Sequence, residues 1–249
     1  MIEDMRYSNL TFDFSGHIVL ISGGSRGIGR GLVEAFLLSG AKVLYASRYP
    51  MENDQSNNAI HISVDLSEEA GIIKLFKEVD SIGTPSILIN SAAINFTKRN
   101  EDITRKEWNS VIETNLSASF YVCKEALLRM KKEKRGKIVN ISSIAGRHRS
   151  IVSGAHYVSS KAGLIGLTKQ LAFESAQYNI NVNAVCPSQT MTDMLQKSMS
   201  QDDLINLTKN IPLNRIASIK DQVGVVLFLC SDAASYITGT YIDVNGGQI

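Results

Sequence analysis

The stretch SGGSRGIG at residues 22–29 decides the fold of this 249-residue chain. It follows a short apolar run at residues 17–21 and opens directly into a segment with helical period at residues 28–39. A glycine-rich turn between a strand and a helix lets the backbone approach a diphosphate, and the helix N-terminus offers free N–H groups and the positive end of its dipole. One glycine motif is weak evidence, but its setting between strand and helix favours a nucleotide site over a plain turn.

The rest of the chain alternates between strand-like and helix-like segments. Helical period is found at residues 28–39, 68–79, 108–130, 157–178 and 221–229. Short runs rich in β-branched residues predict seven buried strands, at residues 17–21, 42–46, 60–64, 86–89, 137–141, 180–184 and 241–244. Such alternation implies a parallel sheet with right-handed crossovers. We therefore expect an α/β protein with a three-layer Rossmann fold, in which helices cover both faces of a doubly wound parallel sheet of about seven strands.

No linker, repeat or composition step divides the chain, so we expect a single domain over residues 1–249, with an N-terminal extension at residues 1–11. The polar stretch at residues 51–58 is too short to separate two domains. Because so few residues join the second strand to the third, the crossover helix there is expected to be truncated or replaced by a loop.

Composition argues against several classes of protein. The 26 Lys and Arg residues nearly balance 24 Asp and Glu residues, which argues against a nucleic-acid or anionic-membrane partner. The three cysteines, Cys123, Cys186 and Cys230, form no CxxC pair and suit neither a disulfide framework nor a zinc site, so we expect no metal. Residues 1–16 lack the apolar core of a secretion signal, and no run is long enough to span a membrane. We expect a soluble, cytoplasmic protein.

The glycine spacing GxxxGxG, within ISGGSRGIG at residues 21–29, resembles the short-chain dehydrogenase/reductase family. Further tracts of the family follow along the chain: VDL at 64–66, NSAA at 90–93, TNL at 114–116, ISS at 141–143, YVSSK at 157–161, PS at 187–188, IPLNRIA at 211–217 and SYITGTYIDVNGG at 235–247. The resemblance covers nearly the whole chain, and it is closest in pattern to the 3-oxoacyl-[acyl-carrier-protein] reductases. It implies an oxidoreductase that transfers hydride between a nicotinamide cofactor and a carbonyl or secondary alcohol.

The resemblance also implies a cofactor site. In the family, Asp65 and Leu66 border the adenine, although Asp65 could instead cap the next helix, a role that suits Ser67 better. Ser91 and Ala93 depart from the family's usual NNAG, so no specific contact is assigned to them. The implied cofactor-binding residues are Gly23, Ser25, Arg26, Gly27, Ile28, Gly29, Ser47, Arg48, Asp65, Leu66, Asn90, Ala92, Tyr157, Lys161, Pro187, Thr190 and Thr192.

The choice of nicotinamide cofactor depends on the end of the second strand. A carboxylate there would bind the adenosine ribose of NAD and repel a 2′-phosphate, but this sequence has Ser47 and Arg48. A guanidinium suits a phosphate through forked, charge-assisted hydrogen bonds, and Arg26 in the glycine turn could supply a second cation. Each arginine alone would more often be a solvated surface charge. The two together predict NADP(H).

Tyr157 and Lys161 are four residues apart in a helical segment, so they lie on the same face. A phenol with an ordinary pKa near 10 needs a neighbouring positive charge to exchange protons at neutral pH, and Lys161 provides one. The resemblance implies that Tyr157 is the proton donor and acceptor and that Lys161 also holds the nicotinamide ribose. It further implies that Ser143 binds the substrate oxygen and that Asn115 orders a relay water.

Two of these roles have alternatives within the sequence. Ser142 competes with Ser143, but strand alternation points the two side chains in opposite directions, and Ser143, fourteen residues before Tyr157, fits the family's spacing better. Asn115 could simply satisfy backbone groups within a helix.

The segment after the sixth strand is expected to cover the site. Pro187, Thr190 and Thr192 correspond to family positions near the nicotinamide, with Ser188 in place of the usual glycine. Residues 188–212 would form a substrate lid, although a Met-rich helix is more often ordinary packing.

The substrate is less well defined than the reaction. A 3-oxoacyl thioester is the first expectation; a sugar, polyol or secondary-metabolite carbonyl is the alternative, and a non-catalytic dinucleotide-binding protein is the least favoured. The basic run at residues 129–137 could dock an acidic carrier, and Arg147, His148 and Arg149 hint at an anionic substrate. By resemblance we expect a homotetramer or homodimer, built on the segments 108–130 and 157–178 and on the C-terminal strand region.

Overall fold

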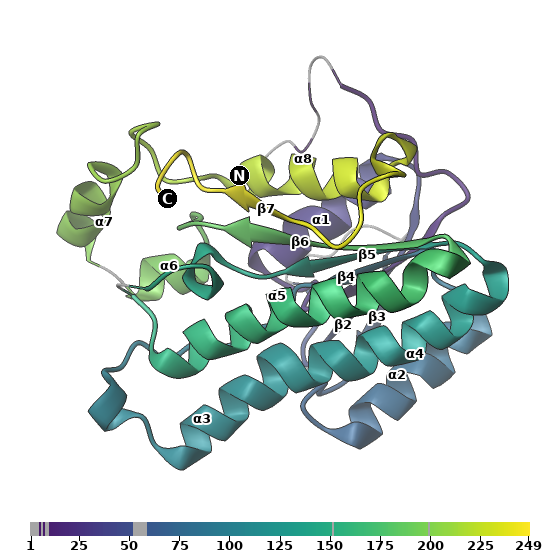
Figure 1. The fold of residues 1–249 in the computed structure, drawn as a ribbon, viewed down its shortest axis with the longest axis horizontal. Helices are drawn as coiled ribbons and strands as arrows, with labels where there is room; N and C mark the ends of the chain where they lie inside the picture. The colour runs from purple at the N-terminus through teal and green to yellow at the C-terminus, as the bar shows by residue number, and fades with distance from the viewer. Residues whose placement is uncertain (1–4, 6, 8–9, 52–58, 151, 199) are drawn as a thin grey trace.

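The computed structural model describes residues 5, 7, 10–51, 59–150, 152–198 and 200–249, and its centre is a parallel sheet of seven strands (Figure 1). The strand order is β3-β2-β1-β4-β5-β6-β7. This arrangement confirms the predicted doubly wound fold, and its order reverses between β1 and β4, where such sheets bind ligands. The strands are β1 (Ile18–Ser22), β2 (Lys42–Ser47), β3 (Ala59–Ser63), β4 (Ile87–Asn90), β5 (Gly136–Ile141), β6 (Ile180–Pro187) and β7 (Tyr241–Val244).

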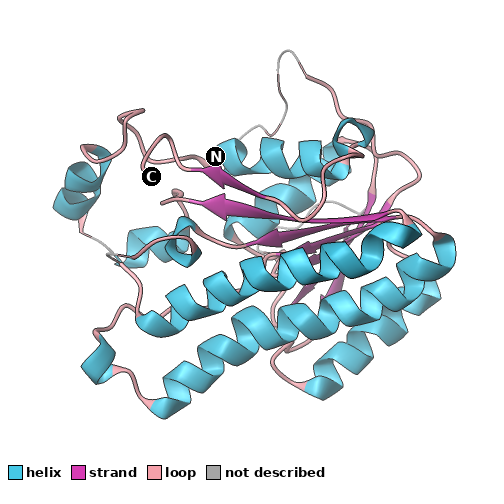
Figure 2. Ribbon diagram, viewed as in Figure 1, coloured by secondary structure: helices cyan, strands magenta, loops and turns pink. Residues whose placement is uncertain are grey.

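Helices cover both faces of the sheet (Figure 2). On one face lie α1 (Gly27–Leu38) and α8 (Ile219–Cys230); on the other lie α2 (Glu69–Ile82), α4 (Ala118–Glu133) and α5 (Ala155–Ser175). Three shorter helices, α3 (Arg105–Ile112), α6 (Asp193–Ser198) and α7 (Gln201–Thr208), extend beyond the sheet at the end where the strands terminate. Single 3₁₀ turns occupy Asn100–Asp102, Ile144–Gly146, Ala176–Tyr178 and Asp232–Ala234.

Alternate residues of each central strand feed two hydrophobic cores. Leu20 of β1 and Leu88 of β4 pack under α2, α4 and α5, while their neighbours Ile21 and Ile89 pack under α1 and α8. Because both faces are covered, these strands read as continuous apolar runs, as is typical of parallel sheets. Buried central strands hold the ends of the sheet in fixed register, and that register positions the residues described below.

The predicted helix over residues 108–130 is interrupted. A π-helical turn, Glu113–Ser117, separates α3 from α4, and Asn115 lies inside it. A widened turn of this kind has no signature in the 3.6-residue period, so periodicity could not reveal it.

The predicted capping role of Ser67 is also wrong. Helix α2 begins at Glu69, and the Asp65 carboxylate instead accepts hydrogen bonds from the Ser67 N–H at 3.0 Å and the Ser67 hydroxyl at 2.7 Å. This tight local turn holds Asp65 at the end of the segment that follows β3.

Two expectations concern segments that are described only in part. Residues 48–51 contain no helix, and the remainder of the predicted loop between β2 and β3, residues 52–58, lies outside the described residues. In the N-terminal extension, Met5 packs against Gly31 of α1 and the Tyr7 hydroxyl donates to the Lys220 carbonyl at 2.7 Å. No helix in the described part of the chain is long and apolar enough to cross a membrane.

Candidate active site

A cleft of about 1680 Å³ lies at the carboxyl ends of the strands. It is bounded on one side by the turn between β1 and α1 and on the other by α6 and the segment that joins β6 to it. Of the predicted site residues, only Asn90 and Asn115 do not line it. Those that do are Gly23, Ser25, Arg26, Gly27, Ile28, Gly29, Ser47, Arg48, Asp65, Leu66, Ala92, Ser143, Tyr157, Lys161, Pro187, Thr190 and Thr192.

The glycine turn forms a cradle that side chains would fill. Gly23 has φ +71°, and a Cβ there would lie 2.6 Å from the Ala92 Cα. A Cβ on Gly29 would lie 2.2 Å from the Gly23 carbonyl oxygen. Helix α1 begins just after this turn without a side-chain cap, so its first N–H groups remain available. These features fit the diphosphate of a dinucleotide.

Two exposed arginines border this end of the cleft, Arg26 before α1 and Arg48 after β2. Neither forms an ion pair with any other described residue. Asp65 faces the same region, and its pKa is lowered chiefly by the hydrogen bond from the Ser67 side chain and also by the charge of Arg48. This end of the cleft therefore offers two arginines and one carboxylate to a ligand.

The Asn90 side chain lies beneath the cleft. It is buried, and its Nδ2 donates to Asn140 Oδ1 at 2.9 Å and to Cys123 Sγ at 3.1 Å. Asn140 in turn donates to Thr168 Oγ1 at 2.9 Å. This buried chain ties β4 and β5 to α5, and sequence reasoning missed it because its members are spread over the chain without a local motif.

Lys161 is the buried cation of the site. Only 2% of the residue is exposed, and its Nζ donates to the Ile141 carbonyl at the end of β5 at 2.7 Å. Burial lowers the pKa of Lys161 from its ordinary value to about 8. Its ammonium group lies 5.6 Å from the centre of the Tyr157 ring.

Tyr157 and Ser143 lie together on the same wall. Burial raises the pKa of the Tyr157 phenol to about 12, and a hydrogen bond with the Ser143 side chain acts in the opposite direction. Ser142 is placed differently: its hydroxyl is buried and donates to the Lys161 carbonyl at 2.8 Å. Of the two serines, the structure thus brings Ser143 to Tyr157.

Asn115 stabilises the wall from behind. Its Oδ1 accepts from the Ile94 N–H at 2.8 Å, and its Nδ2 donates to the Ile94 carbonyl at 3.0 Å and to Ser160 Oγ at 3.1 Å. Ile94 lines the cleft and Ser160 belongs to α5. The π-helical turn therefore joins the segment after β4 to the helix that carries Tyr157.

The segment that follows β6 forms the opposite wall. The methyl group of Thr192 would lie 3.4 Å from a Cβ on Gly27, so the two walls approach each other at the glycine turn. Met191, Met194 and Leu195 also line the cleft. The mobility of this predicted lid stays a prediction.

Comparisons with known proteins agree with this geometry. The family model described as Enoyl-(Acyl carrier protein) reductase matches residues 23–248. The 3-oxoacyl-[acyl-carrier-protein] reductase FabG of Salmonella typhimurium is 36% identical over 246 residues, which cover 94% of this chain and 98% of the relative. The chain belongs to the short-chain dehydrogenase/reductase family.

Two solved structures resemble this chain over nearly its whole length. A short-chain dehydrogenase from Leptospira borgpetersenii with bound NAD+ has a TM-score of 0.89 and 32% identity, covering 95% of this chain and 94% of that one. A putative gluconate dehydrogenase from Agrobacterium tumefaciens has a TM-score of 0.88 and 31% identity, covering 96% and 98%. A nicotinamide dinucleotide is thus the cofactor class of the family.

The structure corrects one expectation about this family member's basic residues. Arg147 pairs with the Asp243 carboxylate, stacks 4.6 Å from the centre of the Tyr241 ring, and does not line the cleft. His148 and Arg149 do line it. The sequence could not show this because Asp243 is 96 residues away.

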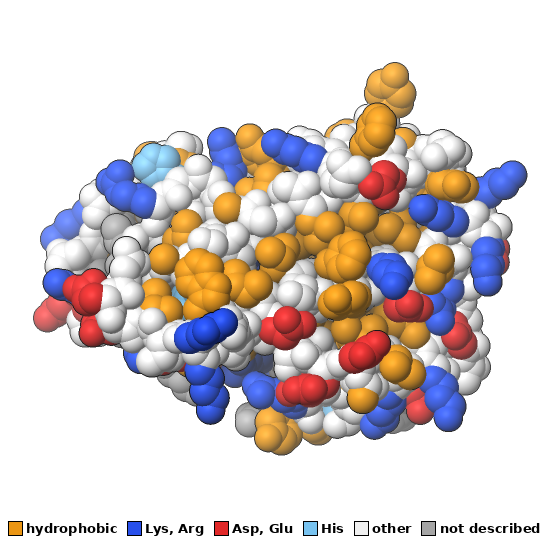
Figure 3. Space-filling view, turned by 60° about the horizontal axis from the view of Figure 1, so that its bottom comes forward, with side chains coloured by type: hydrophobic (Ala, Val, Ile, Leu, Met, Phe, Trp, Pro, Cys, Tyr) orange, Lys and Arg blue, Asp and Glu red, His pale blue; other side chains and the backbone are white. Residues whose placement is uncertain are grey.

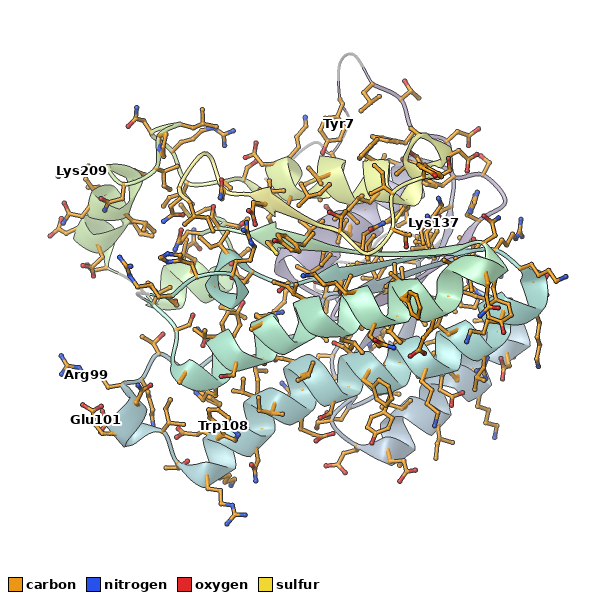
Figure 4. The ribbon with its side chains drawn as sticks, viewed as in Figure 1. Tyr7, Arg99, Glu101, Trp108, Lys137 and Lys209 are labelled. Carbon is orange, nitrogen blue, oxygen red and sulfur yellow. The ribbon has the colours of Figure 1, made fainter. Side chains whose placement is uncertain are left out.

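The basic run at residues 129–137 lies far from the cleft. Arg129 binds Asp80 at 2.6 Å and Glu125 at 2.9 Å. Lys137 is the second residue of β5, at the end of the sheet opposite α7 and its neighbour Lys209 (Figure 4). The run lies at the end of the sheet away from the cleft, and its docking of an acidic carrier stays a prediction. Within the described ranges, no three His, Cys, Asp or Glu side chains gather as a metal site would require.

The buried charge of Lys161 predicts a dependence of stability on pH. Since its folded pKa is about 8 and its ordinary value is 10.5, the unfolded chain binds more protons between these pH values, and stability rises with pH there. Relative to Lys161→Met, the unfolding free energy of the wild type should therefore rise by of order 3 kcal/mol from pH 8 to 10.5. Denaturant titrations across this range measure it, with Lys106→Met on the exposed side of α3 as the control. Parallel curves for wild type and Lys161→Met would show that the folded protein does not perturb this ammonium.

Proposed function

We propose that the protein transfers hydride between NADP(H) and a carbonyl or secondary alcohol. The observation that carries this proposal is the grouping of Tyr157, Ser143 and buried Lys161 on one wall of a cleft that ends in the glycine cradle. A protein that only binds dinucleotides has no need of a proton donor held beside a buried cation.

Each residue has a distinct task in the proposed mechanism. The cofactor supplies or accepts the hydride when it is bound. In the reducing direction, Ser143 and Tyr157 orient the carbonyl oxygen by hydrogen bonds, and Tyr157 gives that oxygen its proton. A pKa of about 12 keeps this phenol protonated at neutral pH, which is the form that donates a proton during reduction. In the oxidising direction, Tyr157 takes the proton back, and the Lys161 charge favours the phenolate.

The preference for NADP(H) is supported by Arg26 and Arg48. Both are exposed at the cleft edge and have no carboxylate partner among the described residues, so they remain available to a 2′-phosphate. A guanidinium binds a phosphate with two parallel hydrogen bonds. The proposed cofactor contacts are those of the predicted site residues that line the cleft.

A 3-oxoacyl thioester is the first candidate substrate, because curated relatives at 36% and 37% identity are named for that activity. A hydroxylated carbonyl compound is the second candidate, and a specific observation favours it. The side-chain oxygens of Asn95, Gln189 and Gln248 are buried without a hydrogen-bond donor, and all three residues line the cleft. Rotation of these amide groups toward the cleft would let hydroxyl groups of a sugar or sugar acid supply donors, and Arg149 could bind a carboxylate or phosphate.

Association into a homotetramer or homodimer is supported by an apolar face. Figure 3 shows hydrophobic side chains gathered over α4 and α5. The exposed members include Phe120, Tyr121 and Leu128 on α4 and Phe173 on α5. Contiguous exposed apolar surface of this kind marks protein contacts. A cytoplasmic location is supported by the three cysteines, all buried and unpaired.

Replacing Arg48 tests the cofactor assignment. Arg48→Asp places a carboxylate where the 2′-phosphate would bind, and repulsion should raise the dissociation constant of NADPH by about 100-fold while changing that of NADH by less than about threefold. Quenching or enhancement of nicotinamide fluorescence measures both. Lys77→Asp, at an exposed position on α2 outside the cleft, is the control. An equal loss of affinity for the two cofactors would refute the preference for NADP(H).

A substrate panel tests the two candidate classes. NADPH oxidation is followed with acetoacetyl thioesters, simple ketones, and hydroxylated carbonyls such as keto-sugars and keto-sugar acids. Turnover of thioesters alone supports the first candidate, and turnover of hydroxylated carbonyls without thioesters supports the second. If no carbonyl in the panel is reduced and no corresponding alcohol is oxidised with NADP+, the proposed reaction is wrong.

A further inference from the structure

Gln222 is a buried polar residue that the reaction chemistry does not use. It lies on α8, is fully buried, and does not line the cleft. Its Nε2 donates to Thr190 Oγ1 at 3.1 Å and to the Val244 carbonyl at 3.3 Å. Because a carbonyl can only accept, the amide nitrogen must face Val244, and this fixes the orientation of the whole side chain.

This orientation leaves the other half of the amide unpaired. Gln222 Oε1 is buried and has no hydrogen-bond partner. An unsatisfied buried acceptor costs about 1–3 kcal/mol, whereas an apolar side chain of the same shape would avoid that cost. Stability alone therefore does not explain a glutamine at this position. We expect its role to lie in positioning the group to which it donates.

The group that Gln222 holds is the Thr190 hydroxyl. Thr190 accepts the hydrogen bond from Gln222 and donates its own proton to the Ser188 carbonyl at 3.1 Å. The Ser188 N–H donates to the Val244 carbonyl at 3.1 Å, the same oxygen that Gln222 contacts. Gln222 thus ties the root of the segment after β6 to the end of β7.

Backbone bonds extend this anchor on the other side of Thr190. The Ala217 N–H donates to the Gln189 carbonyl at 3.2 Å, and the Met191 N–H donates to the Ala217 carbonyl at 2.8 Å. Residues 188–191 all line the cleft. Three groups hold this backbone from behind: the end of β7, the backbone of Ala217, and Gln222. Of these three, Gln222 acts through its side-chain amide, which reaches Thr190 from α8.

We propose that Gln222 is a positioning residue for the nicotinamide half of the cofactor site and that it acts through Thr190. The inference rests on the proposed function, because it assumes that residues 188–192 face the nicotinamide. Gln222 itself contacts neither cofactor nor substrate; it sets the position of the wall that does.

The test separates the two halves of the cofactor. Gln222→Met keeps the volume of the side chain and removes both hydrogen bonds, so the dissociation constant of NADPH should rise about tenfold, the equivalent of one hydrogen bond. Binding of 2′,5′-ADP, which lacks the nicotinamide, should change by less than about twofold, because the glycine cradle and both arginines are untouched. Calorimetric titration measures both ligands, and the unfolding temperature should not fall because the unpaired oxygen is removed as well.

A double-mutant cycle shows whether Gln222 acts through Thr190. Thr190→Val removes the hydroxyl and keeps the main chain, and the variant with both substitutions should bind NADPH about as weakly as Gln222→Met alone. Losses that multiply, or equal losses for NADPH and 2′,5′-ADP, would overturn the proposal and leave Gln222 with a structural role only.

The same binding measurements distinguish a failure of the proposed function from a failure of the inference about Gln222. If the wild type binds neither NADPH nor NADH, the cofactor proposal fails, and the inference fails with it. If the wild type prefers NADH, the test uses NADH in place of NADPH and ADP-ribose in place of 2′,5′-ADP. Gln222→Met should then weaken NADH binding about tenfold and change ADP-ribose binding by less than about twofold. If the wild type binds its cofactor and Gln222→Met binds it equally well, only the inference is wrong.

Discussion

The site depends on one hydrogen bond, from the Lys161 ammonium to the Ile141 carbonyl at 2.7 Å. This bond joins α5 to the last residue of β5, only two residues before Ser143. Because Tyr157 lies one turn before Lys161 on α5, the same bond sets the position of the phenol relative to Ser143. It also keeps a cation in a place from which water is almost excluded, and this is why the pKa of Lys161 is low.

The fold supplies what this bond requires. The strand order reverses between β1 and β4, so the carboxyl ends of the central strands leave a crevice that no crossover covers. Buried polar groups then fix the surrounding elements: Asn115 joins Ile94 to α5, and Asn90 with Asn140 joins β4 and β5 to α5. The side chains of these three asparagines are paired inside the protein, as burial demands. The unpaired oxygen of Gln222 is an exception, and it lies directly behind the cleft wall.

Local sequence signals predict the fold and the proximity of Tyr157 and Lys161. The alternation of buried strands and helices, the glycine turn, and the four-residue spacing of Tyr157 and Lys161 are all set within a few neighbouring residues, where period and sterics govern. The serine assignment also follows from strand alternation, and the structure brings Ser143 rather than Ser142 to Tyr157.

Contacts between distant segments could not be predicted in the same way. Arg147 is paired by Asp243, and the basic run at residues 129–137 lies at the end of the sheet away from the cleft. The π-helical turn at Glu113–Ser117 breaks a period that looks continuous in sequence. Gln222 precedes an apolar helical run and attracts no notice until its partners, Thr190 and Val244, are brought to it by the fold.

The central claim is that Tyr157 moves the proton in the reaction. Tyr157→Phe removes the phenol oxygen and little else, so the most direct test compares steady-state oxidation of NADPH by a reducible carbonyl with equilibrium binding of NADPH. The account predicts that turnover falls by about a thousandfold, because general acid catalysis contributes on that order, while the dissociation constant of NADPH changes by less than about threefold. Turnover within about tenfold of the wild type, with binding intact, would contradict it.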